Sequence, residues 1–181
     1  MIKKAPLVFL SLGSNRGERE RNIEEALMQL DRLSPGLKAS RIYETEPLYF
    51  RAQPFFLNCV AALSWESSPY ELLDHLKSLE REFGRRQSRR FGPRPLDIDI
   101  LLWGRRVLAS SRLTIPHPRL TERRFVLLPL LELAPQAWDP IDGIPYWKKL
   151  LQAPKALVYF YAFSRYTLRQ PALRKLSGKG L

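Results

Sequence analysis

The chain has 181 residues, of which 45% are apolar, and these values predict one globular domain with a hydrophobic core, or one domain with an appendage. Its single cysteine excludes a disulfide framework and a cysteine-based zinc site, and no apolar run is long enough to span a bilayer. The net charge of +12 is compatible with nucleic acid or with any phosphorylated ligand as a partner.

The first half of the chain is expected to alternate between strands and a helix. An apolar run predicts a strand over 6–12, which a turn at 13–15 should end. Apolar residues at helical spacing predict a helix over 18–33. Two further strands are expected over 37–43 and 55–65.

The next helix has clear sequence signals at both ends. Ser68 is a suitable N-cap, Pro69 suits the first helical position, and Glu71 completes a capping box. Gly84 fits the C-terminal end of this helix. A Pro- and Gly-rich basic loop follows and leads into a strand over 97–102.

The elements that follow are shorter. A turn within 103–109 is expected to make a hairpin with the preceding strand. Thr121 is expected to cap a helix over about 122–132, interrupted near Pro129, and a short helix is expected over 146–151.

The predicted order β-α-β-β-α-β is that of the ferredoxin-like split arrangement. It predicts an α+β fold with a ferredoxin-like antiparallel sheet and helices packed on it in three layers. Composition changes near Pro154, and residues 153–181 contain basic but no acidic residues. We therefore expect a domain over 1–152 and a basic C-terminal extension over 153–181, in which the aromatic run 156–163 fits either a strand or a helix.

Two aspartates in the last strand of this order indicate a metal site. Asp97 and Asp99 share one face because successive strand residues point to opposite sides. Neighbouring carboxylates repel each other, and Mg²⁺ would relieve this while taking further ligands from a substrate phosphate. The arginines of 89–94 suit a polyphosphate. The alternative is that both aspartates simply face water. The other face of the strand is expected to be apolar and to carry Ile98, Ile100 and Leu102.

Some polar residues have two interpretations. The turn at 13–15 either offers backbone donors to an anion or only connects a strand to a helix. Asn58, inside an apolar strand, either bonds neighbouring backbone or contacts a polar heterocycle. His117, between two prolines, is either a plain loop residue or a rigidly held hydrogen-bond donor to a phosphate.

Rival functions share parts of this pattern. A small nucleic-acid-binding domain would fit the charge and the sheet, but it would carry aromatic residues where the aspartates stand. A metal-dependent nuclease would use the same aspartates but usually needs a third acid or a base.

Several short motifs are more specific together than alone. They are Ser11-Leu12-Gly13-Ser14-Asn15, Tyr43-Glu44-Thr45-Glu46-Pro47, Phe56-Leu57-Asn58, the segment 80–85, Phe91-Gly92-Pro93-Arg94-Pro95-Leu96-Asp97-Ile98-Asp99-Ile100, and Ile115-Pro116-His117-Pro118 followed by Arg123 and Phe125. In order and spacing, over about residues 5–150, they resemble the 6-hydroxymethyl-7,8-dihydropterin pyrophosphokinase family of folate biosynthesis.

The resemblance implies an ATP-dependent diphosphotransferase that moves the pyrophosphoryl group of ATP to the hydroxymethyl group of the pterin and releases AMP. It implies two Mg²⁺ ions on Asp97 and Asp99, and catalytic roles for Arg85 and Arg94. The implied ATP-binding residues are Glu80, Arg94, Ile100, Thr114, His117 and Arg123. The implied pterin-binding residues are Gly13, Ser14, Asn15, Thr45, Pro47, Leu48, Phe56, Asn58, Asp97 and Phe125.

The expected setting is that of a cytoplasmic monomer that acts on small molecules, with no membrane and no nucleic acid as partner. The chain departs from the family at Gln87, where an arginine is common, so Arg86, Arg89 or Arg90 would serve in its place. Tyr49 stands where a glycine is common.

Overall fold

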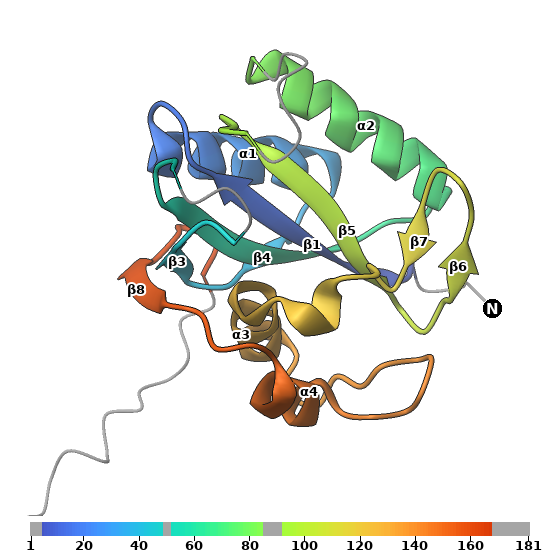
Figure 1. The fold of residues 1–181 in the computed structure, drawn as a ribbon. Coiled ribbons are helices and arrows are strands. Elements are labelled where there is room, and N and C mark those ends of the chain that lie inside the picture. The colour runs from blue at the N-terminus through green and yellow to red at the C-terminus, as the bar shows by residue number, and fades with distance from the viewer. Residues whose placement is uncertain (1–4, 49–51, 85–91, 168–181) are drawn as a thin grey trace, which may run out of the picture.

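The fold is built on one six-stranded antiparallel sheet (Figure 1). The computed structural model describes residues 5–48, 52–84 and 92–167. The strand order is β5-β1-β4-β3-β8, and β2 also pairs with β4. These strands are β1 (Leu7–Ser14), β2 (Lys38–Ala39), β3 (Ile42–Thr45), β4 (Phe56–Ser64), β5 (Asp97–Trp103) and β8 (Val158–Ala162).

Helices cover both faces of the sheet (Figure 1). On one face lie α1 (Arg19–Leu33) and α2 (Pro69–Glu82), and on the other lie α3 (Arg124–Leu133) and α4 (Tyr146–Gln152). The strand order and the three layers confirm the predicted ferredoxin-like α+β fold. No helix in the described residues is long and apolar enough to cross a membrane.

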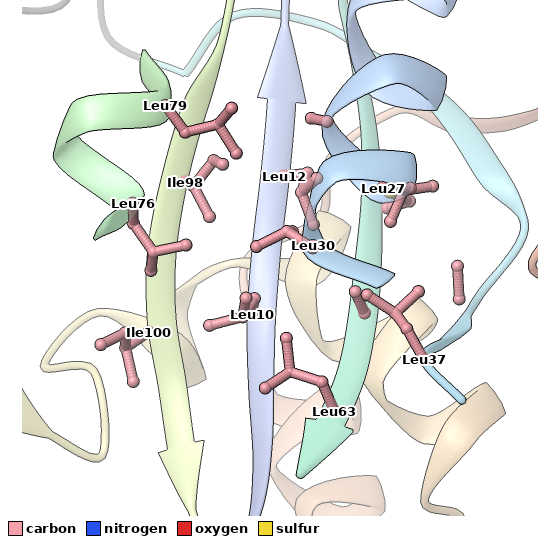
Figure 2. Close-up of a cluster of buried hydrophobic side chains, with 14 of the residues drawn as sticks. Leu10, Leu12, Leu27, Leu30, Leu37, Leu63, Leu76, Leu79, Ile98 and Ile100 are labelled. Atoms are coloured by element: carbon pink, nitrogen blue, oxygen red, sulfur yellow. The ribbon is translucent and has the colours of Figure 1, made fainter. Parts of the chain in front are cut away.

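The sheet separates two hydrophobic clusters, because its central strands alternate their side chains between the two faces. Leu10 and Leu12 of β1 point toward α1 and α2, where they meet Leu27 and Leu76 (Figure 2). Phe9, which directly precedes Leu10 and so points to the opposite face, belongs to the second cluster under α3 and α4. Burial of each such side chain contributes about 1.5–3 kcal/mol to the stability of the fold. Because β1 has side chains in both clusters, it helps to hold the helices on both faces of the sheet.

The predicted signals at both ends of α2 are confirmed. The Ser68 hydroxyl accepts a hydrogen bond from the Glu71 N–H at 3.2 Å, and the Glu71 carboxylate accepts one from the Ser68 N–H at 3.0 Å. Pro69 stands at the first helical position, and Gly84 follows the helix with a φ of +82°. A positive φ of this size favours glycine, which explains where the helix ends.

Two strand predictions need correction. The expected turn at 13–15 begins too early, because Gly13 and Ser14 are still within β1, which is paired on both sides at Gly13. The expected strand over 37–43 is split into β2 and β3 at Ser40 and Arg41. The Ser40 hydroxyl accepts the Val60 N–H at 2.9 Å, so a side chain replaces a backbone acceptor at the break.

The expected face of Leu102 is also wrong, because β5 contains an irregularity. Leu10 pairs with Ile100 but Phe9 pairs with Leu102, so Leu101 is an extra residue in β5. Such a bulge inverts the alternation of side chains beyond it. Leu102 therefore joins the second cluster, whereas Ile98 and Ile100 stay in the first.

The hairpin expected after β5 does not form with β5. Strand β6 (Leu108–Ala109) pairs instead with β7 (Thr114–Ile115) in a small second sheet. The outer edge of β5 is occupied at this point, because Leu101 O accepts the His117 N–H at 2.9 Å.

The start of the third helix also differs from the prediction. Thr121 lies inside a 3₁₀ helix (Leu120–Glu122), and Arg123 precedes α3 without a side-chain cap. Pro129 lies within α3 and does not interrupt it. It removes one backbone donor, but its buried neighbours Val126 and Leu130 pack under the sheet and hold the helix in place.

The chain beyond Pro154 begins as part of the main sheet. The aromatic run forms strand β8, which pairs with β3, so of the two expected structures it adopts the strand and not the helix. Arg165 makes an ion pair with Glu24 of α1 at 3.2 Å, and Tyr166 O accepts the Ala39 N–H at 2.8 Å. The division of the chain at 152/153 into a domain and an extension stays a prediction.

Candidate active site

A cavity of about 290 Å³ opens over one end of the sheet. Strands β1, β3, β4 and β5 and the start of α3 contribute to its walls. The sequence-predicted residues that line it are Gly13, Thr45, Leu48, Phe56, Asn58, Arg94, Asp97, Asp99, His117, Arg123 and Phe125. These residues are far apart in the sequence, so the fold brings most of the predicted site together.

A single cross-strand row forms the floor of this cavity. Gly13 of β1 pairs with Asn58 of β4 on one side and with Asp97 of β5 on the other. Neighbouring strands lie about 4.8 Å apart, so the Cα atoms of Asn58 and Asp97 stand about 10 Å apart across the glycine. Because glycine has no side chain, the floor between these two polar groups is open to a flat ligand.

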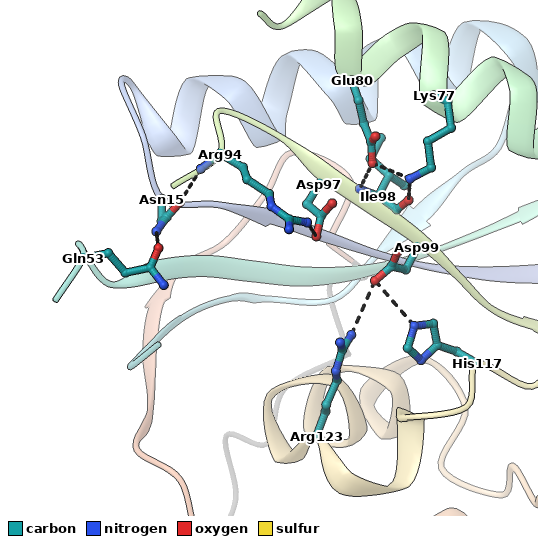
Figure 3. Close-up of polar contacts among 10 residues, drawn as sticks. All are labelled: Asn15, Gln53, Lys77, Glu80, Arg94, Asp97, Ile98, Asp99, His117 and Arg123. Atoms are coloured by element: carbon teal, nitrogen blue, oxygen red, sulfur yellow. Dashed lines mark hydrogen bonds and ion pairs between the residues drawn. The ribbon is translucent and has the colours of Figure 1, made fainter. Parts of the chain in front are cut away.

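The two aspartates lie on the cavity side of β5, and each faces cations (Figure 3). Asp97 Oδ2 is 2.8 Å from Nη1 of Arg94. Asp99 Oδ2 is 3.4 Å from Nη1 of Arg123 and 3.7 Å from Nε2 of His117. Asp97 and Asp99 keep side-chain exposures of 26% and 30%, so their oxygens remain accessible to a ligand or an ion.

The chemistry of this donor set fits Mg²⁺. The two carboxylates supply only oxygen, and the arginines beside them would favour a phosphate as the next ligand. No group of three or more His, Cys, Asp or Glu side chains in the described residues could hold a metal ion by itself. A cation here would therefore depend on water and on substrate oxygens, as Mg²⁺ usually does.

His117 is held as a neutral donor. Its Nδ1 accepts the N–H of Arg119 at 3.1 Å, which places the ring proton on Nε2, the nitrogen that faces Asp99. Burial lowers the pKa of His117 below its usual value; Asp99 opposes this shift, and the cations Arg123 and Arg119 add to it. The ring is therefore neutral at pH 7 and directs an N–H into the cavity.

The other end of the row is built around a buried amide. Asn58 is 4% exposed, and its Nδ2 donates to Thr45 Oγ1 at 2.7 Å. This contact leaves Oδ1 as the oxygen that lies over Gly13. Phe56 from β4 and Phe125 from α3 add aromatic walls to the same cavity. The arrangement suits a flat heterocycle with donor groups along one edge.

Gly13→Ala tests this arrangement directly. A Cβ at this position would stand 3.0 Å from Oδ1 of Asn58, closer than ordinary contacts. The Asn58 amide must then shift away from the position in which it would meet the ligand, and an imperfectly paired buried polar group costs about 1–3 kcal/mol, so we expect binding of the heterocyclic ligand to weaken about 5- to 150-fold while nucleotide binding changes little. Calorimetric titration with each ligand measures both effects.

A double mutant supplies the control for this prediction. In an Asn58→Ala background the clashing amide is absent, so adding Gly13→Ala should cause little further loss. Fully additive losses would contradict a contact between the two side chains.

Glu80 lies outside the cavity lining, at the free edge of β5 (Figure 3). It is 1% exposed, and its Oε1 accepts the N–H of Ile98 at 2.8 Å and a bond from Lys77 Nζ at 2.8 Å. Lys77 also donates to Ile98 O at 3.3 Å. The pair therefore holds the backbone of the one residue that separates Asp97 and Asp99.

The remaining predicted residues have other positions. The cavity lining does not include Ile100 of β5, Thr114 of β7, Ser14, Asn15 or Pro47. The Ser14 hydroxyl is buried and accepts from Asn22 Nδ2 at 3.3 Å. Arg85, Arg86, Gln87, Arg89, Arg90 and Tyr49 lie outside the described residues.

The cavity also includes residues that the sequence did not single out for a role, namely Ser11, Glu46, Gln53 and Gly92. Ser11 pairs with Asp99 across β1 and β5, so strand register places it beside the carboxylates. A polar residue between Leu10 and Leu12 in a buried strand was the available signal for it.

Comparisons with known proteins show the family of the chain. A family model described as 7,8-dihydro-6-hydroxymethylpterin-pyrophosphokinase (HPPK) matches residues 9–135. The chain is 37% identical over 152 residues to the 2-amino-4-hydroxy-6-hydroxymethyldihydropteridine pyrophosphokinase of Bacillus subtilis, which covers 79% of this chain and 91% of that protein.

Longer relatives match over a part of their length. The chain is 42% identical over 161 residues to the mitochondrial folate synthesis bifunctional protein of Arabidopsis thaliana, which covers 87% of this chain and 28% of that protein. A crystal structure of HPPK-DHPS in complex with substrates has a TM-score of 0.67 at 14% identity and covers 83% of this chain and 43% of the other. This structural likeness shows the fold.

Proposed function

Because the chain belongs to the 7,8-dihydro-6-hydroxymethylpterin-pyrophosphokinase family, we propose that it transfers the pyrophosphoryl group of ATP to 6-hydroxymethyl-7,8-dihydropterin in folate biosynthesis. The observation that carries this proposal is the row Asn58–Gly13–Asp97 on the cavity floor. It joins a heterocycle-binding end to a carboxylate end, and the Cα atoms at these two ends lie about 10 Å apart, which is two strand spacings.

The pterin would lie over Gly13. With Nδ2 of Asn58 bonded to Thr45, Oδ1 is available to accept hydrogen bonds from the amino and N–H groups of the pterin edge. Phe56 and Phe125 would flank its ring faces. This orientation directs the hydroxymethyl group toward β5.

The carboxylate end would hold two Mg²⁺ ions on Asp97 and Asp99. When bound, these ions would neutralise phosphate oxygens and align the phosphate chain for in-line displacement. Arg123 is suited to the same phosphates, because its Nε is buried and has no hydrogen-bond partner in the described part of the chain. His117 would add an N–H donor, and Arg94 a guanidinium, near the transferred group.

The nucleobase has a natural place at the outer edge of β5. Ile98 presents its N–H and C=O outward, since Glu80 and Lys77 bind them. Ile100, two residues further on, has the same orientation in a strand and would offer one donor and one acceptor to adenine, with Thr114 nearby on β7. In this arrangement Glu80 fixes the edge that the nucleotide uses.

In the reaction, the pterin hydroxyl would attack the β-phosphorus of ATP. A bond forms between this oxygen and the phosphorus, the bond from the phosphorus to the α-phosphate oxygen breaks, AMP leaves, and the hydroxyl proton passes to solvent. Such a transfer needs positioning and charge stabilisation rather than a covalent enzyme intermediate, and the proposed site residues would supply both. A catalytic role for Arg85 remains part of the proposal.

The setting is also a proposal. We propose that the protein acts as a monomer on small molecules, a class of ligand that fits a cavity of about 290 Å³. We propose a cytoplasmic location and no nucleic-acid partner, because the carboxylates at the centre of the site would repel a nucleic-acid backbone.

A product assay tests the function. Purified protein is incubated with ATP and Mg²⁺, with and without the hydroxymethyl dihydropterin, and nucleotides are separated by chromatography. We expect AMP and pterin diphosphate in equal amounts, and no AMP without the pterin. ADP as the product, or cleavage of added nucleic acid, would contradict the proposal in favour of a different kinase or a nuclease.

A further inference from the structure

The side chain of Asn15 joins two segments that are far apart in the sequence, one at Gln53 and Pro54 and the other at Arg94. Asn15 follows β1 directly and is 1% exposed. Its Nδ2 donates to Gln53 Oε1 at 3.0 Å and to Pro54 O at 3.2 Å (Figure 3 shows the first contact). Its Oδ1 accepts the N–H of Arg94 at 2.7 Å, and its own N–H donates to Arg94 O at 3.0 Å.

These contacts leave the Asn15 amide little capacity for a substrate. Both hydrogens of Nδ2 and one lone pair of Oδ1 are used within the protein. Asn15 is also absent from the cavity lining. A role that acts through other residues therefore fits its position better than direct contact with the pterin.

Both joined segments contribute residues to the cavity lining. Gln53 lines the cavity, as do Leu48 and Phe56, which are proposed to contact the pterin. Arg94 also lines it and pairs with Asp97 at 2.8 Å. Asn15 is thus a direct hydrogen-bonded bridge between a segment of the proposed pterin wall and the segment that pairs with the carboxylate.

The chemistry of the bridge requires an amide. It needs two donors toward Gln53 and Pro54 and one acceptor toward Arg94, on a side chain of this length. Aspartate has the acceptor but neither donor, and its charge would face the Pro54 carbonyl. Asn15→Asp therefore breaks the pterin side of the bridge and keeps the Arg94 side.

We propose that Asn15 is a positioning residue that couples nucleotide binding to pterin binding. The inference rests on the proposed function, since it assumes that both ligands share this cavity. A ligand that engages Asp97 changes the ion pair that holds Arg94, and the Arg94 backbone is tied through Asn15 to the wall that contacts the pterin. By linkage, each ligand then changes the affinity for the other by the same factor.

The test measures this factor. The Kd of the hydroxymethyl pterin is determined by calorimetry alone and with a saturating non-hydrolysable ATP analogue and Mg²⁺. In the wild-type protein we expect the analogue to change the pterin Kd at least about fivefold, within the usual range of coupling between sites. Asn15→Asp should reduce the change to less than about twofold, while the Kd of the analogue alone stays within about threefold.

Asn22→Asp is the matched control. Asn22 makes the same kind of bridge nearby, since its Nδ2 donates to Arg16 O at 3.0 Å and Pro95 O at 3.0 Å, but it does not contact Gln53 or Pro54. The same chemical change there should keep the wild-type coupling factor. If Asn15→Asp does not fold, Gln53→Ala breaks the bridge from its other end and should at least halve the factor.

The outcomes separate this inference from the proposed function. A wild-type protein that binds both ligands with no coupling, or an Asn15→Asp protein with the full coupling factor, overturns the inference alone. An equal loss of coupling in Asn22→Asp also overturns it, because the effect would then be general to the loops. A wild-type protein that binds neither ligand would overturn the proposed function itself.

Discussion

Asp97→Ala is expected to lower the rate of pyrophosphoryl transfer at least about a thousandfold, which corresponds to about 4 kcal/mol of lost transition-state stabilisation. The carboxylate is one of the two groups proposed to hold Mg²⁺, and alanine offers no oxygen in its place. The protein should stay folded, since the ion pair with Arg94 is partly exposed and such pairs contribute about 0–1 kcal/mol.

Single-turnover kinetics at several Mg²⁺ concentrations measure the effect, and a thermal melt checks the fold. Asp74→Ala is a suitable control, because Asp74 also pairs with an arginine, Arg112 at 2.6 Å, but lies on the surface with 64% of its side chain exposed. It should turn over like the wild-type protein. Near-normal turnover of Asp97→Ala at ordinary Mg²⁺ concentrations would remove Asp97 from the proposed metal site.

Asn58→Ala is expected to weaken pterin binding by about 1–3 kcal/mol, or about 5- to 150-fold, and to leave binding of an ATP analogue nearly unchanged. The buried edge groups of the pterin would lose their acceptor, whereas the phosphate-binding residues lie at the other end of the floor. The substitution also removes the hydrogen bond that the Asn58 amide donates to the Thr45 hydroxyl.

Calorimetry with each ligand separates the two expectations. A similar loss for both ligands, together with a lowered melting temperature, would show that Asn58 acts mainly in folding. A loss confined to the pterin supports its proposed place in the pocket.

Local signals predicted the parts of the fold that depend on neighbouring residues. The capping box of Ser68 and Glu71 lies within four residues, and the helical spacing of α1 is set by its own sequence. The shared face of Asp97 and Asp99 followed from strand periodicity alone, and both line the cavity as expected. Such features need no knowledge of distant partners.

Other features depended on partners far away in the chain. The row of Gly13, Asn58 and Asp97 arises from strand register, which the packing of the whole sheet decides. The contacts of Glu80 with Ile98 arise because β5 is an edge strand. The extra residue Leu101 in β5 depends on packing in the hydrophobic clusters on the two faces of the sheet. The motifs indicated a shared site for these residues, but not their contacts.

The aromatic run after Pro154 shows the same limit. Its sequence fits a strand or a helix, and it forms a strand because it pairs with the edge of β3. The pairing has a further consequence. Thr45 pairs with Val158, so β8 covers the backbone donors and acceptors that β3 would otherwise present at the rim of the sheet. An uncovered strand rim is a template for intermolecular β-pairing and aggregation. Strand β8 thus moves the open edge of the sheet away from Thr45 and becomes the edge strand in place of β3.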